Sequence, residues 1–374
     1  MKYFLIIFLV IPVISFAQNV VHINNSEELE SINFESNKTY LLKSGFVYEV
    51  SKPIRFSNLQ NVTLTSSENE NLPEIRYTGD EDSDLVYIRA SRNIRIENLK
   101  LTGSFNNSIV HISGHYSTDA PPTNHTTIRN CEISKAFNGI RSLPYSTKCD
   151  TITIIDCNIH HLTDDGVFIA DCDFVKVQGC HIWHVNLNWN KGRVNSGDCI
   201  HLTGNCSNWI IKNNVLDRRL TSNKFCFIYG NKGYLPVQGE IVGNTFYPPK
   251  DTIGGVGSAI YISESDYVKI DSNRFLSDGY QWGGKPGAIA HLEARQIDFS
   301  NNYINNLTRC YFTNRVKKAN VENNTMQDCF GKFFYYFGEL NALNNTFYNL
   351  KGWAYAAEGA GGVLIDINTI YESD

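Results

Sequence analysis

Beyond its first 17 residues the chain contains no apolar run long enough to cross a membrane, so no transmembrane helix is predicted. The net charge is −5, which gives the chain no general attraction for nucleic acid or for anionic membranes. Helical periodicity is missing, and so is the LxxLxL framework of leucine-rich repeats. These absences exclude helical solenoids and basic nucleic-acid-binding modules and leave an all-β architecture.

The N-terminus is the apolar exception. A basic start at Lys2, an apolar run over residues 4–16 and the small Ala17 are typical of a secretory signal peptide at residues 1–17. The alternative, a membrane anchor, is disfavoured because the run is shorter than the roughly 20 residues that a spanning helix needs. We therefore expect a secreted or periplasmic protein, and we expect a monomer.

A short motif recurs along most of the chain, as in IRNCEI (128–133), IKNNVL (211–216) and ALNNTF (342–347). Each copy is a short alternating strand, two polar positions, a variable residue and an apolar residue. The fourth position is always Cys or Asn, 21 to 34 residues after the previous one: Cys131, Cys157, Cys180, Asn214, Asn244, Asn273, Asn302, Asn324 and Asn345. A repeat of this length is the signature of a solenoid.

A second strand follows each motif, as in NGIRSL (138–143) and DCIHLT (198–203). Period-2 alternation with Gly, Asn and Asp between the strands favours β-strands over helices. The pattern predicts an all-β, single-domain right-handed parallel β-helix, a pectate-lyase-like solenoid with a ladder of stacked Asn and Cys. We expect an N-terminal cap region at residues 18–55, which covers the open end of the stack, and the β-helix at residues 56–374.

Ten cysteines in an exported protein would ordinarily suggest disulfides. Three of them, however, occupy the ladder position that Asn fills later, so we expect stacked buried thiols there. Bridges between adjacent coils remain the alternative.

Aligning the second strands places one outward column at Arg141, Phe168, His201, Phe227, Tyr261 and either Ala290 or His291. A second column lies three positions earlier, at Asn138, Asp165, Asp198, Lys224 and Ser258. An extended polar and aromatic face suits a linear polymer. Asp165 and Asp198 can alternatively be turn residues.

Long connections at 185–197, 247–257 and 276–286 are expected to form one wall of a groove. Trp189 and Trp282 lie in them, either as sugar-stacking platforms or as loop anchors. Basic residues gather between 190 and 224, against the acidic balance of the whole chain: Lys191, Arg193, Lys212, Arg218, Arg219 and Lys224. This cluster predicts a cradle for a polyanion, with a solvated basic face as the alternative.

A uronic-acid polymer would match such a cradle. Cleaving it by β-elimination requires neutralisation of the C5 carboxylate, a base at C5 and a proton donor for the leaving oxygen. Arg218 or Arg219 can neutralise the carboxylate. Lys224, with His184 or His201, can move the protons. The remaining predicted substrate-binding residues are Arg141, His160, His161, Asp198, Trp189, Tyr261 and Trp282.

GDCIHL (197–202), followed one coil later by RRLTSNKFCFI (218–228), resembles the β-helix polysaccharide lyases, most of all the mannuronate-cleaving alginate lyases of polysaccharide lyase family 31. That resemblance implies a lysine and a tyrosine as the acid/base pair. Lys224 would be the lysine. No Tyr stands in the strands just before Lys224, so a histidine would have to replace it. The calcium-binding Asn and Glu set of polysaccharide lyase family 6 is not found near the lysine.

DDGVFI (164–169) and SGDCIHLTGNCSNWII (196–211) are also similar to the polygalacturonases of glycoside hydrolase family 28. That likeness implies hydrolysis by Asp165 and Asp198. The GHG and RIK motifs of that family are missing after Asp198. A noncatalytic carbohydrate-binding solenoid is the third interpretation. No cofactor is expected to be required, although Ca²⁺ could assist as a carboxylate neutraliser.

Overall fold

A computed structural model describes the chain from residue 19 to residue 371 with gaps. The gaps are at 69, 80–82, 115–120, 145–146, 188–196, 219–225, 231–237, 248–258, 277–289, 306–309, 313–315, 329, 337, 358–361 and 367. The side chains at 226–227, 229–230, 290–292, 310–312, 330–336, 351–352 and 356–357 are likewise not described. The predicted signal peptide lies outside the described residues and stays a prediction.

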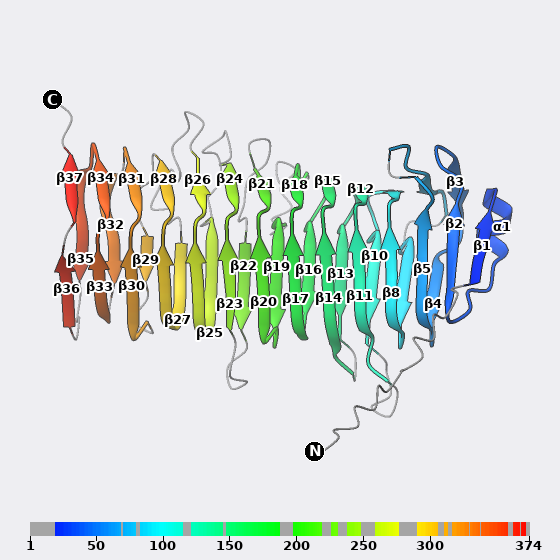
Figure 1. Ribbon diagram of the computed structural model, residues 1–374, viewed down its shortest axis with the longest axis horizontal. Helices are drawn as coiled ribbons and strands as arrows, with labels where there is room; N and C mark the ends of the chain where they lie inside the picture. The colour runs from blue at the N-terminus through cyan, green and yellow to red at the C-terminus, as the bar shows by residue number, and fades with distance from the viewer. Residues whose placement is uncertain are drawn as a thin grey trace, which may run out of the picture.

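The strands stack as three rows of parallel neighbours, one strand of each row per coil (Figure 1). The first row contains β4 (Ile54–Ser57), β7 (Val86–Arg89), β10 (Val110–Ser113), β13 (Ile140–Leu143), β16 (Val167–Ala170), β19 (Ile200–Gly204), β22 (Cys226–Gly230), β29 (Cys310–Phe312), β32 (Phe330–Tyr336) and β35 (Lys351–Ala357). The second row contains β1 (Asn19–Ile23), β2 (Lys38–Leu42), β5 (Gln60–Ser66), β8 (Arg92–Glu97), β11 (Asn124–Arg129), β14 (Cys149–Ile155), β17 (Cys172–Gln178), β20 (Asn208–Lys212), β23 (Gln238–Val242), β30 (Lys318–Glu322), β33 (Glu339–Leu343) and β36 (Gly362–Asp366). Two longer strands, β25 (Ile260–Asp271) and β27 (Ala290–Ser300), run through both rows and join them.

The third row forms a separate sheet along the upper edge of Figure 1. It contains β3 (Val47–Val50), β6 (Glu74–Tyr77), β9 (Lys100–Thr102), β12 (Glu132–Ala136), β15 (Asn158–Leu162), β18 (His181–Trp183), β21 (Val215–Asp217), β24 (Thr245–Tyr247), β26 (Arg274–Phe275), β28 (Tyr303–Asn305), β31 (Thr325–Gln327), β34 (Thr346–Tyr348) and β37 (Thr369–Tyr371). The predicted all-β parallel β-helix is confirmed. No helix among the described residues is long and apolar enough to span a membrane.

The core is a stack of like residues at matching register. Ile140, Val167 and Ile200 are direct partners on β13, β16 and β19, and all three are fully buried. Because side chains alternate between the two faces of a strand, the residue after each of these belongs to the outward face. The core therefore sets which residues reach the surface of the first row.

The predicted ladder is present as a chain of buried amides. The backbone N–H and the side-chain amide of Asn244 both donate to Oδ1 of Asn273, at 2.9 and 3.0 Å. The same side-chain amide also donates to the Ile211 carbonyl at 2.9 Å. The pattern runs from Asn214 to Asn345 and ends on Asn368, one coil beyond the predicted column. The ladder satisfies backbone groups inside each turn, where water cannot reach them.

The residue before each ladder position has a left-handed backbone, for example Asp156, Asn213 and Asn301 with φ of 53° to 54°. Asn, Asp and Gly are the residues that adopt this conformation at the least cost. This requirement explains the first of the two polar positions in the sequence motif.

The seven cysteines with described side chains are free and buried, as predicted for the ladder positions. Cys131, Cys157 and Cys180 continue the ladder, and the Cys180 N–H donates to Asn214 Oδ1 at 2.9 Å. The others are Cys149, Cys172, Cys199 and Cys206. The side chains of Cys226, Cys310 and Cys329 are outside the described residues.

The N-terminal end of the stack is covered by α1 (Ser26–Ser31). Asn25 caps this helix by accepting the Glu28 N–H at 2.9 Å, and Leu29 is buried against the core. Strands before residue 56 already stack on later ones, since β2 pairs with β5 and β3 with β6. The boundary between cap region and β-helix at residue 55 stays a prediction.

Candidate functional site

A row of side chains follows the outer surface of the first row of strands. Consecutive register partners are Arg55, Tyr87, His111, Arg141, Phe168 and His201; the register then continues through the backbone of Phe227 to Tyr261. We call these residues the outward row. The register confirms the predicted alignment of Arg141, Phe168, His201 and Tyr261.

A second column precedes the outward row by three residues in each coil, and its side chains act on the backbone of the next coil. Asn138 Oδ1 accepts the Asp165 N–H at 2.9 Å, and Asp165 Oδ1 accepts the Asp198 N–H at 2.5 Å. Asp165 and Asp198 are 3% and 1% exposed. Their predicted alternative role as turn residues is therefore present in the structure.

Asp165 has a second oxygen, and this one faces His201. His201 Nδ1 lies 3.3 Å from Asp165 Oδ2 and 4.0 Å from Asp198 Oδ2. Its ring meets that of Phe168 edge to face at 4.8 Å. A carboxylate that accepts a hydrogen bond from Nδ1 leaves the lone pair on Nε2, and Asp165 is the nearer of the two carboxylates to Nδ1. We call Asp165, Asp198 and His201 the His201 centre; it can take or give one proton at the outward row.

Asp164 adds an acid beside this centre. Burial and the neighbouring charge of Asp165 raise the pKa of Asp164 to about 7, although Arg141 acts in the opposite direction. A carboxyl group with such a pKa is partly protonated near neutral pH and can act as a general acid. Asp164 was not among the predicted site residues; its position next to Asp165 was the available signal.

Arg218 does not reach the surface in this structure. Its side chain is fully buried, and its guanidinium donates to the Gly197 carbonyl at 3.0 Å. Gly197 directly precedes Asp198, so Arg218 supports the turn that holds the His201 centre. This burial disfavours the predicted role of Arg218 as the group that neutralises a substrate carboxylate.

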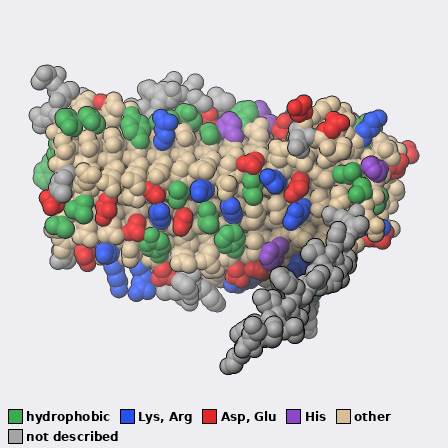
Figure 2. All heavy atoms as spheres, in the orientation of Figure 1, with side chains coloured by type: hydrophobic (Ala, Val, Ile, Leu, Met, Phe, Trp, Pro, Cys, Tyr) green, Lys and Arg blue, Asp and Glu red, His purple; other side chains and the backbone are tan. Residues whose placement is uncertain are grey.

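The other predicted histidines form a separate cluster in the middle of the third row, with His160 and His161 on β15 and His184 directly after β18. Nδ1 of His160 and Nδ1 of His161 are 2.7 Å apart, and the His161 ring lies 4.4 Å from that of His184. Trp183 stacks on His160 with ring centroids at 4.8 Å. Figure 2 shows histidine side chains at the upper edge of the molecule, over this part of the stack.

Burial favours the neutral form of these imidazoles. It lowers the pKa of His160 to about 4, with the nearby His161 acting in the same direction. Burial also lowers the pKa of His161 and of His184. The structure therefore separates the two predicted partners of Lys224: His184 belongs to this neutral aromatic cluster and His201 to the carboxylate pair.

Four predicted site residues lie outside the described residues: Lys224, Arg219, Trp189 and Trp282. Lys224 stands two positions before Cys226, as Asp198 stands two positions before Ile200, so the two share a column in the sequence repeat. The functional roles of these four residues stay predictions, as do those of His160, His161, Arg141 and Tyr261.

Asp165, Asp198 and His201 each offer one ligand atom within 4.8 Å of the others. Ca²⁺ takes six to eight oxygen ligands, whereas this group offers two carboxylates and an imidazole. Carboxylates with an imidazole suit a transition metal better than Ca²⁺. These three side chains alone are not a calcium site, and the possible assistance by Ca²⁺ stays a prediction.

One aspartate–histidine pair was not predicted from the sequence. His111 Nδ1 lies 2.6 Å from Asp84 Oδ2, and the two residues hold the same column positions as His201 and Asp165. The strand segments VYIR (86–89) and VHIS (110–113) carry the signal, since they align with IRSL and VFIA. Between these two segments, the ladder position is occupied by the buried Leu99. The Asn or Cys that marks the ladder position of the other repeats is therefore missing from this one.

Comparison with known proteins supports this architecture. A family model described as a right handed beta helix region matches residues 84–251. The chain is a right-handed parallel β-helix. The matched segment contains the Asp84–His111 pair, the His201 centre and Lys224. No curated protein matches the chain by sequence.

Solved structures share the fold at low sequence identity. The A-module of the mannuronan C-5 epimerase AlgE6 of Azotobacter vinelandii superposes with a TM-score of 0.65 and 14% identity, covering 94% of this chain and 100% of that one. The lacto-N-biosidase of family GH136 from Eubacterium ramulus gives 0.61 and 10%, covering 95% and 68%. The catalytic domain of a GH87 α-1,3-glucanase gives 0.57 and 10%, covering 94% and 69%. At these identities the likeness concerns the fold.

Proposed function

We propose that this protein is an enzyme that acts on a uronic-acid-containing polysaccharide, and specifically a lyase that cleaves mannuronate linkages of alginate by β-elimination. The observation that carries the proposal is the His201–Asp165 pair, in which His201 belongs to the outward row, with Phe168 and Phe227 as its register partners. An acid/base group at this position faces any polymer that lies along the first row of strands.

The dimensions of the outward row support a polymeric substrate. Neighbouring strands are about 4.8 Å apart, so the seven steps from Arg55 to Tyr261 span roughly 34 Å. A compact metabolite would contact only one or two coils of such a face. A linear polysaccharide can contact every coil.

In the proposed reaction Nε2 of His201 removes the C5 proton of a bound uronate unit. The C–H electron pair forms the C4–C5 double bond, and the bond from C4 to the glycosidic oxygen breaks. The leaving oxygen takes up a proton, for which Lys224 is the proposed donor, and Arg219 is the proposed partner of the carboxylate. Asp165 holds the imidazole in the tautomer that can accept the proton.

The fold comparison is consistent with chemistry at this carbon. The Azotobacter vinelandii protein is a mannuronan C-5 epimerase. Elimination and C5 epimerisation both begin with removal of the C5 proton; they differ in whether the C4–O bond then breaks. This argument supports the choice of mannuronate as the first substrate to test.

Hydrolysis is the second candidate, and Asp164 is the observation that favours it. Its pKa of about 7 suits a general acid. The predicted inverting pair is disfavoured, because an oxygen of Asp165 and one of Asp198 lie within 4.8 Å, whereas the carboxyl groups of inverting enzymes are about 6.5–9.5 Å apart. A hydrolase would therefore use Asp164 as the acid.

Product analysis distinguishes these functions. Purified protein is incubated with polymannuronate, polyguluronate, polygalacturonate and polyglucuronate. A lyase generates the ultraviolet absorbance of the C4–C5 double bond, and a hydrolase generates reducing ends alone. A change in uronate composition without cleavage would indicate an epimerase and would overturn the lyase assignment. Binding with none of these changes would indicate a noncatalytic solenoid.

Replacement of His201 tests the proposed centre. His201→Ala is expected to lower turnover by about 10²–10⁴-fold, the range for loss of a general acid or base. Lys224→Ala is expected to abolish turnover. His125→Ala, which changes an exposed histidine on β11, is the matched control and should leave turnover unchanged. Retention of near-normal activity by either His201→Ala or Lys224→Ala, with thermal unfolding unchanged, would refute its assignment.

A further inference from the structure

The N-terminal half of the outward row carries a second group of charged and aromatic side chains, which the proposed reaction does not use. The guanidinium carbon of Arg55 lies 5.5 Å from the ring centroid of Tyr87, and that of Arg89 lies 5.9 Å from it. Arginines that contact an aromatic ring keep their N–H groups for a ligand, because the ring is not a hydrogen-bonding carboxylate. Two guanidinium groups are thus held beside Tyr87 in the outward row.

The Asp84–His111 pair lies directly beside them. The His111 ring meets the Tyr87 ring edge to face at 5.2 Å, and Asp84 Oδ1 accepts the Ser108 N–H at 2.9 Å. Burial is the largest single influence on the pKa of Asp84 and raises it, but the hydrogen bond and charge of His111, the Ser108 N–H and the charge of Arg141 together lower the pKa below its usual value. Asp84 is therefore held ionised, with His111 and Arg141 both acting on its charge.

This arrangement repeats that of the His201 centre. In each case an aspartate of one coil contacts Nδ1 of a histidine in the next coil. His111 and His201 are three register steps apart, or roughly 14 Å at the usual strand spacing. Two like arrangements on one straight row meet a periodic polymer at two of its units.

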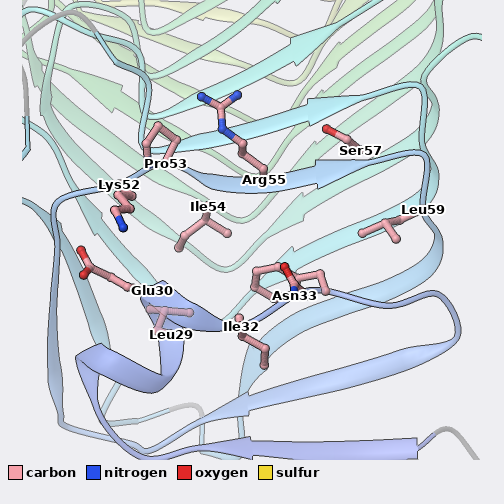
Figure 3. A pocket seen from close by; sticks show the side chains of 11 residues that line it. Leu29, Glu30, Ile32, Asn33, Lys52, Pro53, Ile54, Arg55, Ser57 and Leu59 are labelled. Carbon is pink, nitrogen blue, oxygen red and sulfur yellow. The ribbon is translucent and has the colours of Figure 1, made fainter.

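The row begins at a hollow, and Figure 3 shows its surroundings. A pocket of about 270 Å³ lies between β4 and the segment that follows α1, and Asn33, Lys52 and Arg55 are among the residues that line it. In Figure 3 the Arg55 side chain extends from β4 toward the neighbouring strand, while Lys52 lies on the other side of Pro53. A polysaccharide that extends beyond the outward row at this end would therefore meet a further basic side chain, Lys52.

We propose that Arg55, Tyr87, Arg89 and Arg141 form an arginine subsite that binds the carboxylate of a second uronate unit of the same polymer. The inference rests on the proposed function for the identity of the polymer. Tyr87 is four register steps from His201, so the second unit lies roughly 19 Å from the reacting one. A carboxylate is the group expected there, because guanidinium groups bind it through paired charge-assisted hydrogen bonds.

The subsite is tested by binding, which does not depend on turnover. The double variant Arg55→Ala/Arg89→Ala is compared with Arg92→Ala/Arg95→Ala, which removes two exposed arginines from β8 in the second row. Retardation in native gels containing polymannuronate, polygalacturonate or neutral dextran gives the affinities. We expect the first variant to bind at least one uronate polymer about tenfold more weakly, as for loss of a charged hydrogen bond, and the control to bind as wild type.

Kinetics give a second measurement on the same proteins. For long oligouronates the KM of Arg55→Ala/Arg89→Ala should rise with kcat unchanged. For oligomers too short to reach from His201 to Tyr87 both constants should stay at the wild-type values. Equal affinity of the two double variants, equal losses on dextran, or no uronate binding by wild type would each overturn the subsite.

The two proposals fail in different ways. If His201→Ala and wild type are both inactive on every polymer, yet Arg55→Ala/Arg89→Ala still loses affinity, the catalytic proposal fails and the subsite stands. If wild type releases unsaturated products and Arg55→Ala/Arg89→Ala matches it in affinity and KM, the subsite fails and the catalytic proposal stands.

Discussion

Among single residues, Asp164 links the candidate site to stability. Its pKa is raised from 3.8 to about 7 by burial and by the charge of Asp165. Between these two pH values the folded chain keeps a proton that the unfolded chain has lost. The folded state therefore loses stability as the pH rises from about 4 to about 7, and the loss is complete above that window.

Asp164→Asn removes this ionisation, so we expect it to stabilise the protein at pH 8 but not at pH 3.5. The increase in Tm caused by the substitution should be a few degrees larger at pH 8 than at pH 3.5. Thermal unfolding at both pH values measures it. Asp173→Asn, which alters an exposed aspartate, is the control and should show no such difference. A gain that is equal at both pH values would show that Asp164 is not the group responsible.

Sequence reasoning at this scale succeeded where the repeat fixed the register. His201 and Arg141 were placed in one column because their strands align by their apolar residues. The separation of His184 from His201 was not predictable in the same way. His161 and His184 both have left-handed backbones at the corner after the third row, with φ of 55° and 53°. Histidine does not predict a left-handed backbone position in a sequence, whereas Gly and Asn do.

Among the elements, the Asn ladder joins consecutive turns by hydrogen bonds that only a buried amide can make. Asn273 accepts from the backbone and side chain of Asn244 and donates to the Ile241 carbonyl at 2.8 Å. Removing its amide leaves buried donors and acceptors without partners, each at about 1–3 kcal/mol. The ladder should therefore contribute to stability at every turn.

We expect Asn273→Ala to lower the free energy of unfolding by about 3 kcal/mol. Asn323→Gly is the matched control: it changes the exposed residue before a ladder position, and glycine tolerates the φ of 56° there. The control should have a much smaller effect. Denaturant titration measures the free energy of unfolding of both variants. Equal decreases in the two variants would show that the ladder hydrogen bonds do not contribute the expected stability.

The ladder was also the element that the sequence revealed best, and it explains what was missed. Coils with Asn or Cys at the buried turn position were found with their register. The coil with Leu99 at that position was not, although Leu99 is equally buried. An apolar residue fills the same interior space, but it does not distinguish a ladder from an ordinary strand. The Asp84–His111 pair therefore needed the structure.

For the molecule as a whole, the two ends of the stack differ. At the N-terminal end α1 covers the first coil, and Leu29 is 2% exposed. In the last described coil Val363 and Ile365 are 48% and 46% exposed, although their register partners Leu340 and Ala342 are fully buried. Core-facing positions are thus open at one end, where unpaired strand edges promote association with other chains.

The double variant Val363→Lys/Ile365→Lys is expected to reduce concentration-dependent association in light scattering without changing turnover. The expected change in Tm is small, because lysines at these positions remain in water. Leu340→Lys is the positional control: it places the same charge one coil earlier in a fully buried site, so it should destabilise the fold by several kcal/mol. If the double variant lost as much stability as Leu340→Lys, the last coil would have to be covered in solution. In that case the side chains of Val363 and Ile365 would belong to the buried core and not to the surface.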